Sequence, residues 1–224
     1  MARLARVVIP NLPHHVIQRG VRSLPIFNTD QDREEYLRLL RAFGLRYGLK
    51  FWAWCLMTNH VHLVVVPAAP DSLARAIGEA HRRYTRLVNF RESVRGHLFQ
   101  ERFHSFPIET DRHLITVVRY VERNPVRARM VMSAVEYPWS SARYHVTAGA
   151  SDRLVKASPI RQMVPDWAEL LQSQEDGELE VIHRHIRTGR PWGTGEWVKR
   201  LEQRLGRRLQ PRKGGWPKGR SRNT

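Results

Sequence analysis

The first two thirds of the chain alternate between short apolar runs and longer stretches with apolar residues at helical spacing. Runs rich in β-branched and aromatic residues predict four strands, at residues 14–19, 49–58, 56–67 and 98–109. A tight turn at Thr58-Asn59 joins the second strand to the third. Apolar side chains three and four positions apart predict three helices, at about 30–47, 73–90 and 111–123.

The predicted order of elements is β-α-β-β-α-β followed by a helix. This order is that of the ferredoxin-like or RRM-like split βαβ fold. It predicts an α+β protein with helices on one face of an antiparallel sheet. We expect the opposite face of the sheet to be free to hold a site or a nucleic acid.

Two histidines lie two positions apart on the third predicted strand. Side chains at this spacing point to the same face, so His60 and His62 project together with Cα atoms ~7 Å apart. Such a pair is half of a plausible site for a divalent metal ion. The alternative is a pair of surface histidines on a half-buried strand. Trp52 and Trp54 also share one face of the second predicted strand. These two side chains either stack on DNA bases or pack in the hydrophobic core.

The third predicted helix carries a polar row beside its apolar stripe. His113, Thr116, Tyr120 and Asn124 follow one another at spacings of three and four, so they lie on one side of the helix. Tyr120 then sits beside the buried face, where it can look into a cleft. The alternatives are an amphipathic boundary role for Tyr120 and a helix start at Asn124-Pro125.

The charge of the chain points to a polyanionic partner. Among 224 residues, 38 Lys and Arg oppose 21 Asp and Glu, which gives 38 − 21 = +17. This excess predicts nucleic acid as the partner. The lone Cys55 excludes a disulfide framework and a CxxC zinc site. We find no signal peptide and no run long enough to cross a membrane, so we expect a soluble protein of a reducing compartment.

Three stretches resemble a known family. They are Thr-Asn-His-Val-His-Leu-Val-Val at 58–65, Arg-Tyr-Val-Glu-Arg-Asn-Pro-Val-Arg-Ala at 119–128, and Trp-Ser-Ser at 139–141, which we interpret as the cap of a short closing helix. Together they resemble the single-tyrosine HUH transposases of the IS200-like family, in particular the branch of REP-associated tyrosine transposases. The resemblance covers about residues 14–145.

The resemblance implies an HUH endonuclease fold and assigns roles to four residues. His60 and His62 become metal ligands, Asn124 a third ligand, and Tyr120 the nucleophile. The implied cofactor is Mg²⁺ or Mn²⁺. The implied substrate is single-stranded DNA with palindromic, REP-type hairpins, cut through a 5′-phosphotyrosine and rejoined. The implied location is the bacterial cytoplasm at the nucleoid, for a monomer or homodimer without membrane contact.

A free tyrosine has a pKa near ~10, so its activation must come from the metal or from a nearby cation. Arg119, Arg123 and Arg127 are the candidates. By contrast, the second His-x-His, at His183 and His185, falls in a predicted helix at 177–188. Residues two apart diverge on a helix, so we predict that this pair binds no metal. The other histidines, at 14, 15, 81, 97, 104 and 145, have no partner at a useful spacing and are interpreted as structural or DNA-contacting.

The composition changes in the last third of the chain. We predict a catalytic domain at 1–150 and, at 151–224, a basic helical DNA-binding extension that ends in a tail without fixed structure. Predicted helices at 177–188 and 196–209 flank residues 189–195 in a helix-turn-helix-like layout. A solvated basic tail is the alternative. The candidate DNA contacts along the whole chain are Arg19, Arg102, Arg119, Arg123, Arg127, Arg190, Lys199, Arg207, Arg208, Arg212 and Lys213.

Three functions fit these features. The first is a metal-dependent transposase of single-stranded DNA. The second is a non-catalytic regulator that binds DNA hairpins, although such a binder has no need for His60, His62 and Tyr120 together. The third is a replication initiator or plasmid relaxase, which usually has a longer chain with a helicase or a second catalytic tyrosine.

Overall fold

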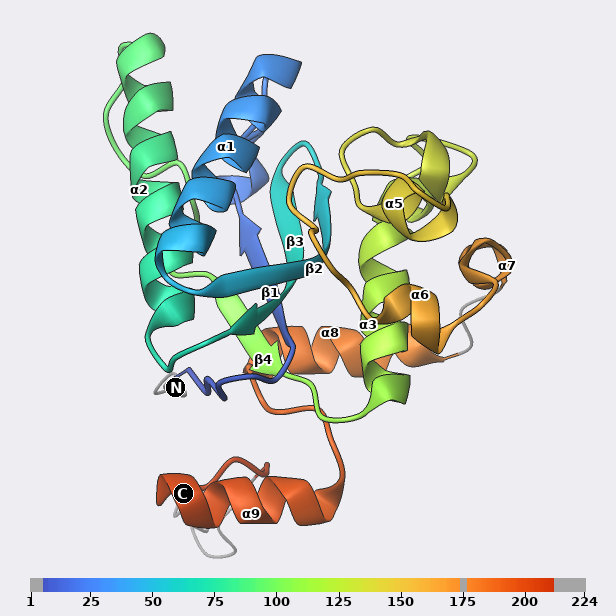
Figure 1. Cartoon of the computed structure of the whole chain (residues 1–224). Coiled ribbons are helices and arrows are strands. Elements are labelled where there is room, and N and C mark those ends of the chain that lie inside the picture. Colours follow the sequence, from blue (N-terminus) through green and yellow to red (C-terminus); the bar gives the residue numbers. More distant parts are fainter. Residues whose placement is uncertain (1–5, 174–176, 212–224) are drawn as a thin grey trace, which may run out of the picture.

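The computed structural model describes residues 6–173 and 177–211 and has a four-stranded antiparallel sheet at its centre (Figure 1). The strands are β1 (His14–Arg19), β2 (Leu49–Leu56), β3 (His60–Pro67) and β4 (His104–Pro107), in the order β2-β3-β1-β4. This order and the succession of elements confirm the ferredoxin-like fold class. Within the described residues, every helix is too short or too polar to span a bilayer.

Helices α1 (Asp30–Arg46) and α2 (Ser72–Arg91) pack together over one face of the sheet (Figure 1). Thr29 begins α1 with a reciprocal cap: its hydroxyl accepts from the Asp32 amide at 3.2 Å, and the Asp32 carboxylate accepts from the Thr29 amide at 3.0 Å. These helices lie where the polar and apolar spacing predicted them.

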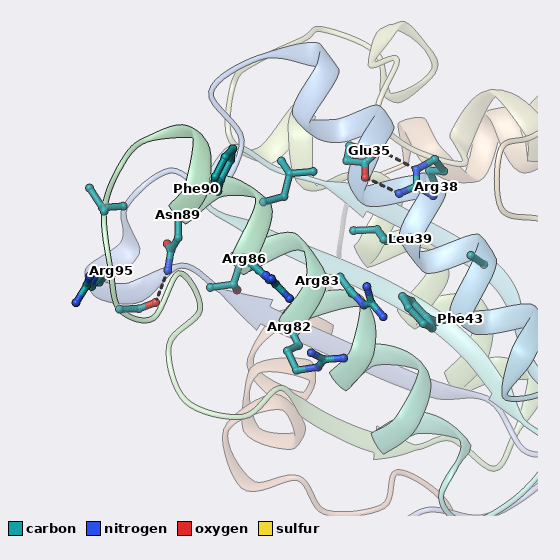
Figure 2. A pocket seen from close by; sticks show the side chains of 15 residues that line it. Glu35, Arg38, Leu39, Phe43, Arg82, Arg83, Arg86, Asn89, Phe90 and Arg95 are labelled. Atoms are coloured by element: carbon teal, nitrogen blue, oxygen red, sulfur yellow. Dashed lines mark hydrogen bonds and ion pairs between the residues drawn. The ribbon is translucent and has the colours of Figure 1, made fainter.

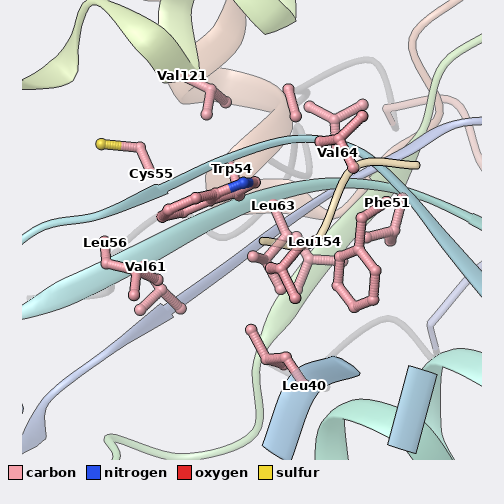
Figure 3. Packing of buried hydrophobic residues seen from close by; sticks show 14 of the residues in the cluster. Leu40, Phe51, Trp54, Cys55, Leu56, Val61, Leu63, Val64, Val121 and Leu154 are labelled. Carbon is pink, nitrogen blue, oxygen red and sulfur yellow. The ribbon is translucent and has the colours of Figure 1, made fainter. Parts of the chain in front are cut away.

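Helix α3 (Asp111–Glu122) packs against β2 and β3 on the other face, so that face carries a helix as well as the candidate site. Figure 3 shows Val121 of α3 and Leu40 of α1 on opposite sides of the sheet, with Leu63 between them. Trp54 is buried here, and its indole nitrogen donates to Asp152 at 2.9 Å, which confirms core packing over base stacking for this residue.

The fourth strand is much shorter than predicted. The sequence predicts residues 98–109, but β4 covers only His104–Pro107. Phe99 makes a single bridge to Gly20, and the residues after it leave the sheet. Glu101 has a φ of 53°, in the left-handed region, which an extended strand cannot contain. The prediction of one continuous strand was therefore wrong.

The Trp-Ser-Ser motif stands at the start of a short closing helix as predicted, with Ser141 as the N-cap residue. Short helix α5 (Ala142–Val146) does follow Ser141, but the hydroxyl of Ser141 makes no capping bond. It accepts from the Trp54 amide at 2.9 Å and donates to Glu122 at 2.5 Å. The motif runs along the edge of β2, where the Leu56 amide donates to the Trp139 carbonyl at 2.8 Å.

The C-terminal third contributes to the main core. After α4 (Asn124–Arg127) and α5 come α6 (Ile160–Met163), α7 (Trp167–Gln172), α8 (Glu178–Thr188) and α9 (Gly195–Leu205), with short 3₁₀ turns earlier at Val21–Ser23 and Ala134–Glu136. Helices α6, α7 and α8 pack on α3, and Ile160, Trp167 and Ile182 are buried with the sheet residues. The domain division at residue 150 stays a prediction.

Helix α9 has a small hydrophobic cluster of its own. Val198, Leu201 and Leu209 pack there with Val7 and Ile9 of the N-terminal segment. The helix ends at Leu205 rather than at residue 209, because Gly206 adopts a left-handed conformation with a φ of 59°. Helix α8 packs instead on β4 and α3. The helix-turn-helix-like layout therefore stays a prediction.

Candidate active site

Two imidazoles of β3 and the phenol of α3 meet on the face of the sheet that α3 covers. The ring centroids of His60 and His62 lie 5.0 Å apart. The Tyr120 ring lies 5.4 Å from that of His62, at an angle of 89°. His62 and Tyr120, which are 58 positions apart in the chain, thus come together within one protomer. Alternate side chains of β3 point to one face of the sheet, and the polar row of α3 points toward the same space.

Asn59, in the turn before β3, determines which ring nitrogen of His60 carries the proton. Asn59 donates through its amide nitrogen to the Ser23 carbonyl at 3.1 Å, so its side-chain oxygen must face the other way. This oxygen lies 2.6 Å from Nδ1 of His60 and can only accept. Nδ1 of His60 therefore carries the proton, which leaves the lone pair of Nε2 for a metal ion. The sequence predicted only a tight turn at Asn59.

A third histidine belongs to the site, although sequence reasoning set it aside. Nε2 of His15 lies 3.0 Å from Nδ1 of His62, and the two rings stack with centroids 5.2 Å apart. His15 is also 6.0 Å from the Tyr120 ring. The sequence does not show how β1 pairs with β3, and this pairing is what brings His15 to the site. Ile17 is paired with His62, and His15 lies two residues before Ile17 on β1. His15 therefore lies on the same face of the sheet as the two β3 histidines.

Burial keeps these imidazoles neutral. Desolvation lowers the pKa of His60 to about 4, with smaller effects of the cations Arg19 and Arg127, and it lowers the pKa of His15 to about 3. The pKa of His62 lies well below its ordinary value, again through burial first and then through its charged and imidazole neighbours. Neutral imidazole is the form that binds a metal ion.

Asn124 and Arg127 complete the surroundings of Tyr120. The Asn124 amide nitrogen donates back to the carbonyls of Tyr120 and Val121, at 2.9 and 3.2 Å. Arg127 donates to the same Tyr120 carbonyl at 3.0 Å, and its guanidinium carbon lies 4.1 Å from the centre of the Tyr120 ring. A cation on the face of this ring can stabilise negative charge on the phenol.

The two imidazoles and Asn124 suit a divalent metal ion that takes its remaining ligands from oxygen atoms outside this set. In the described part of the chain, no three His, Cys, Asp or Glu side chains converge on one point. Two neutral imidazoles, each with its Nδ1 against a hydrogen-bond partner, are suitable as a partial ligand set, and Asn124 lies one helical turn after Tyr120. The ligand roles themselves stay predictions.

The remaining predicted cations are dispersed. Arg119 and Arg123 both donate to the Ser173 carbonyl, so they tie α3 to the end of α7. Arg19 is exposed on β1 opposite His60, and Arg102 is exposed before β4. The C-terminal cations that the structure describes, Arg190, Lys199, Arg207 and Arg208, lie on or beside α8 and α9, and Arg207 donates to the Arg6 carbonyl at 3.0 Å. Arg212 and Lys213 lie outside the described residues.

The second His-x-His lies on α8 as predicted, and its two rings diverge. His185 stacks on Trp192 with centroids 5.2 Å apart, and Trp192 stacks in turn on His113 at 4.7 Å. His183 instead contacts the edge of the site, with its ring centroid 5.8 Å from that of Tyr120. Helix α8 thus lies beside the candidate nucleophile, which sequence reasoning did not foresee.

A buried carboxylate anchors α3 two residues after Tyr120. Glu122 is fully buried and accepts from Ser141 at 2.5 Å, from Nδ1 of His145 at 2.6 Å and from the Trp167 indole at 2.7 Å. These donors come from the Trp-Ser-Ser segment, from α5 and from α7. The carboxylate therefore holds three separate segments against the helix that carries the tyrosine.

The fold and this site define an HUH-class DNA transposase, and comparison with known proteins supplies the family. The family model described as "Transposase IS200 like" matches residues 9–124, just over half of the chain. The chain belongs to this family of IS200-like transposases, as the motifs around His60 and Tyr120 indicated.

One solved structure agrees on the fold. A REP-associated tyrosine transposase bound to a REP hairpin is similar with a TM-score of 0.58 and 16% sequence identity, over 70% of this chain and 93% of that one. A protein from Deinococcus radiodurans R1 named as a transposase gives a TM-score of 0.37 and 19% identity, over 55% of this chain and 97% of that one. No curated protein sequence matches the chain.

Proposed function

We propose that this transposase cleaves and rejoins single-stranded DNA at palindromic, REP-type hairpins, with Tyr120 as nucleophile and a divalent metal ion, Mg²⁺ or Mn²⁺, as cofactor. The observation that carries the proposal is the meeting of Tyr120 with His60 and His62 in one buried space. The similar structure that holds a REP hairpin supports the choice of substrate.

In the proposed reaction the Tyr120 oxygen attacks a backbone phosphorus. The bond from phosphorus to the 3′ oxygen breaks, which leaves a 3′-hydroxyl on one DNA end and a 5′-phosphotyrosine on the protein. Attack of a 3′-hydroxyl on the phosphotyrosine reverses these steps and rejoins DNA. His60 and His62, with Asn124 as the candidate third ligand, would hold the metal ion, which would supply Lewis-acid neutralisation of the phosphate charge.

Residues of this chain prepare the phenol and the imidazoles. Arg127 lies over the Tyr120 ring and favours the phenolate that attacks. His15 and Asn59 hold the two ligand rings through their Nδ1 atoms. Of the three candidate cations, Arg127 is the one on the ring face, whereas Arg119 and Arg123 donate to Ser173.

The decisive experiment is a search for the covalent product. Full-length protein is incubated with labelled single-stranded hairpin DNA and Mn²⁺, and the products are separated on a denaturing gel. Wild type is expected to form a protein–DNA adduct and Tyr120→Phe none, with hairpin binding largely retained. An adduct that persists in Tyr120→Phe would contradict the assignment, and hairpin binding by wild type without any adduct would favour the non-catalytic regulator.

The metal assignment has its own test through Asn59. Asn59→Ala removes the acceptor that holds Nδ1 of His60, without touching either ligand. Loss of such a partner typically weakens metal affinity about 10–100-fold. The Mn²⁺ concentration at half-maximal cleavage should rise by that factor, and direct Mn²⁺ binding to Tyr120→Phe protein should weaken equally when Asn59→Ala is added. Unchanged Mn²⁺ affinity would contradict the role of Asn59.

A further inference from the structure

A large hollow lies away from Tyr120, between α1 and α2 on the opposite face of the sheet. It has a volume of about 1090 Å³, and five arginines line it: Arg38, Arg82, Arg83, Arg86 and Arg95. Glu35 is the one acidic residue in its lining. Figure 2 shows these arginines around the groove, with Phe90 beside them near the end of α2. We call this hollow the α1/α2 groove.

The cations form a row along α2. Arg82, Arg86 and Phe90 are four residues apart, so they follow one another on one side of the helix, with about 6 Å of rise per step. Phe90 is 89% exposed, and Val94 after the helix is 53% exposed. A solvated helix face does not require an exposed phenyl ring at the end of a row of arginines, and Phe90 is not part of the hydrophobic core.

The groove holds positive charge that the fold does not neutralise. Arg38 and Arg82 pair with Glu35 and Glu79 at 2.6 and 2.5 Å. Within the described part of the chain, Arg83, Arg86 and Arg95 make no hydrogen bond or ion pair, although Arg82 and, to a smaller extent, Arg83 lower the pKa of the Glu79 carboxyl. Like charges at helical spacing lower stability, so their accumulation needs a polyanion as its ligand. A second copy of this chain would bring the same charge and is disfavoured.

Smaller hollows connect this groove to the candidate active site. A hollow of about 390 Å³ shares Arg82 and Thr85 with the groove and reaches Arg102. A third hollow, of about 380 Å³, shares Glu101 with the second and reaches Arg19, which lies opposite His60 across β1 and β3. A succession of hollows, lined by cations apart from Glu101 where the second and third meet, therefore runs around the β4 edge of the sheet from Arg19 to α2.

We propose that the α1/α2 groove is a second DNA site, which binds the duplex stem of the hairpin through its phosphates while the adjoining single strand follows Arg102 and Arg19 to Tyr120. Phe90 lies at the far end of the arginine row, where it stacks on an unpaired base of the hairpin loop. This inference rests on the proposed hairpin substrate, and it adds a site remote from the chemistry.

The test compares two variants with equal loss of charge. The groove variant is Arg83→Gln/Arg86→Gln/Arg95→Gln. The control is Arg41→Gln/Lys50→Gln/Lys156→Gln, three exposed cations beside β2, the opposite edge of the sheet from β4. Fluorescence anisotropy measures the affinity of the full chain for a labelled hairpin, without metal and over a range of salt concentrations, so that cleavage plays no part.

The groove variant should bind the hairpin at least tenfold more weakly than wild type, and the slope of log Kd against log salt should fall by about two to three, one for each lost phosphate contact. The control variant should change the affinity for the hairpin and the salt slope much less. Equal effects of the two variants would overturn the groove proposal, whether or not wild type forms the Tyr120 adduct. The proposal would also be overturned if wild-type protein bound polyglutamate as tightly as the hairpin, because the partner of the groove would then be an acidic protein.

The role of Phe90 is tested with a change in the DNA. Phe90→Ala should weaken binding of a hairpin with unpaired loop bases about tenfold. It should leave unchanged the binding of a hairpin whose loop is a glycol spacer. Equal loss on both DNAs would show that the ring does not read the loop and would overturn this part of the proposal.

Discussion

The buried carboxylate of Glu122 offers a sharp test of how α3 is held. Glu122→Gln keeps the shape of the side chain and one oxygen. That oxygen can still accept from Ser141 and His145, as Oε1 of the glutamate does at 2.5 and 2.6 Å. The new amide nitrogen then faces the indole N–H of Trp167, which Oε2 accepts at 2.7 Å in the wild type. Two donors would oppose each other in the protein interior, where both side chains are buried.

The expected cost follows from these three bonds. Hydrogen bonds to a charged acceptor contribute about 1 kcal/mol more than neutral ones, so the two retained bonds each weaken by about that amount. A buried donor without an acceptor costs about 2 kcal/mol. We therefore expect Glu122→Gln to lower the free energy of unfolding by about 4 kcal/mol, which is a large part of the stability of an ordinary domain.

Urea unfolding followed by circular dichroism measures this loss, and Trp167→Phe provides the matched partner. Trp167→Phe removes the opposing donor, so on that background Glu122→Gln should cost only about 2 kcal/mol, a coupling of about 2 kcal/mol between the two sites. A cost below about 1 kcal/mol for Glu122→Gln alone, or strict additivity of the two changes, would refute the reasoning.

Two further predictions concern stability. Gly44→Ala should destabilise the protein by about 1–3 kcal/mol, because a Cβ there would lie 2.5 Å from the ring of Phe51. Gly78→Ala places its Cβ where nothing lies within 4 Å, so it should stabilise α2 by about 0.5–1 kcal/mol. Urea titration of both variants checks that the two effects have opposite signs. Burial lowers the pKa of His14 to about 4, and its Nε2 accepts from the Ile9 amide at 3.1 Å. Between about pH 6.5 and 4 the unfolded chain binds a proton at this residue that the folded chain does not. His14 should therefore make the unfolding free energy fall by up to about 1.4 kcal/mol per unit as the pH drops through this range. His14→Gln should reduce the measured slope by that amount, while other buried histidines such as His15 and His60 keep their own contributions.

The regular elements could be predicted from local patterns. Strand and helix periods are properties of neighbouring residues, and they placed His60 with His62 on one strand face and Tyr120 beside the buried face of its helix. The expectation that the three residues work together came from the family resemblance. The short fourth strand could not be predicted, because the left-handed backbone at Glu101 is not encoded in a hydrophobic pattern.

Residues whose roles depend on pairing between distant segments escaped the sequence. His15 joins the site only once β1 is set in register with β3. The hydroxyl of Ser141 receives the Trp54 amide only once the edge of β2 lies beside it. The arginines of α2 line a groove only once α1 lies opposite them.

Passing segments shield both outer strands of the sheet. On one side, the Trp192 amide donates to the Pro107 carbonyl at 2.9 Å, and the Glu109 amide donates to the Trp192 carbonyl at 3.0 Å. On the other, Leu56 and Ser141 exchange backbone bonds with Trp139 and Trp54. An uncovered outer strand invites pairing with another chain and aggregation. At these positions the polypeptide has already used the groups that such pairing needs, so two copies can associate there only through side chains or through other surfaces.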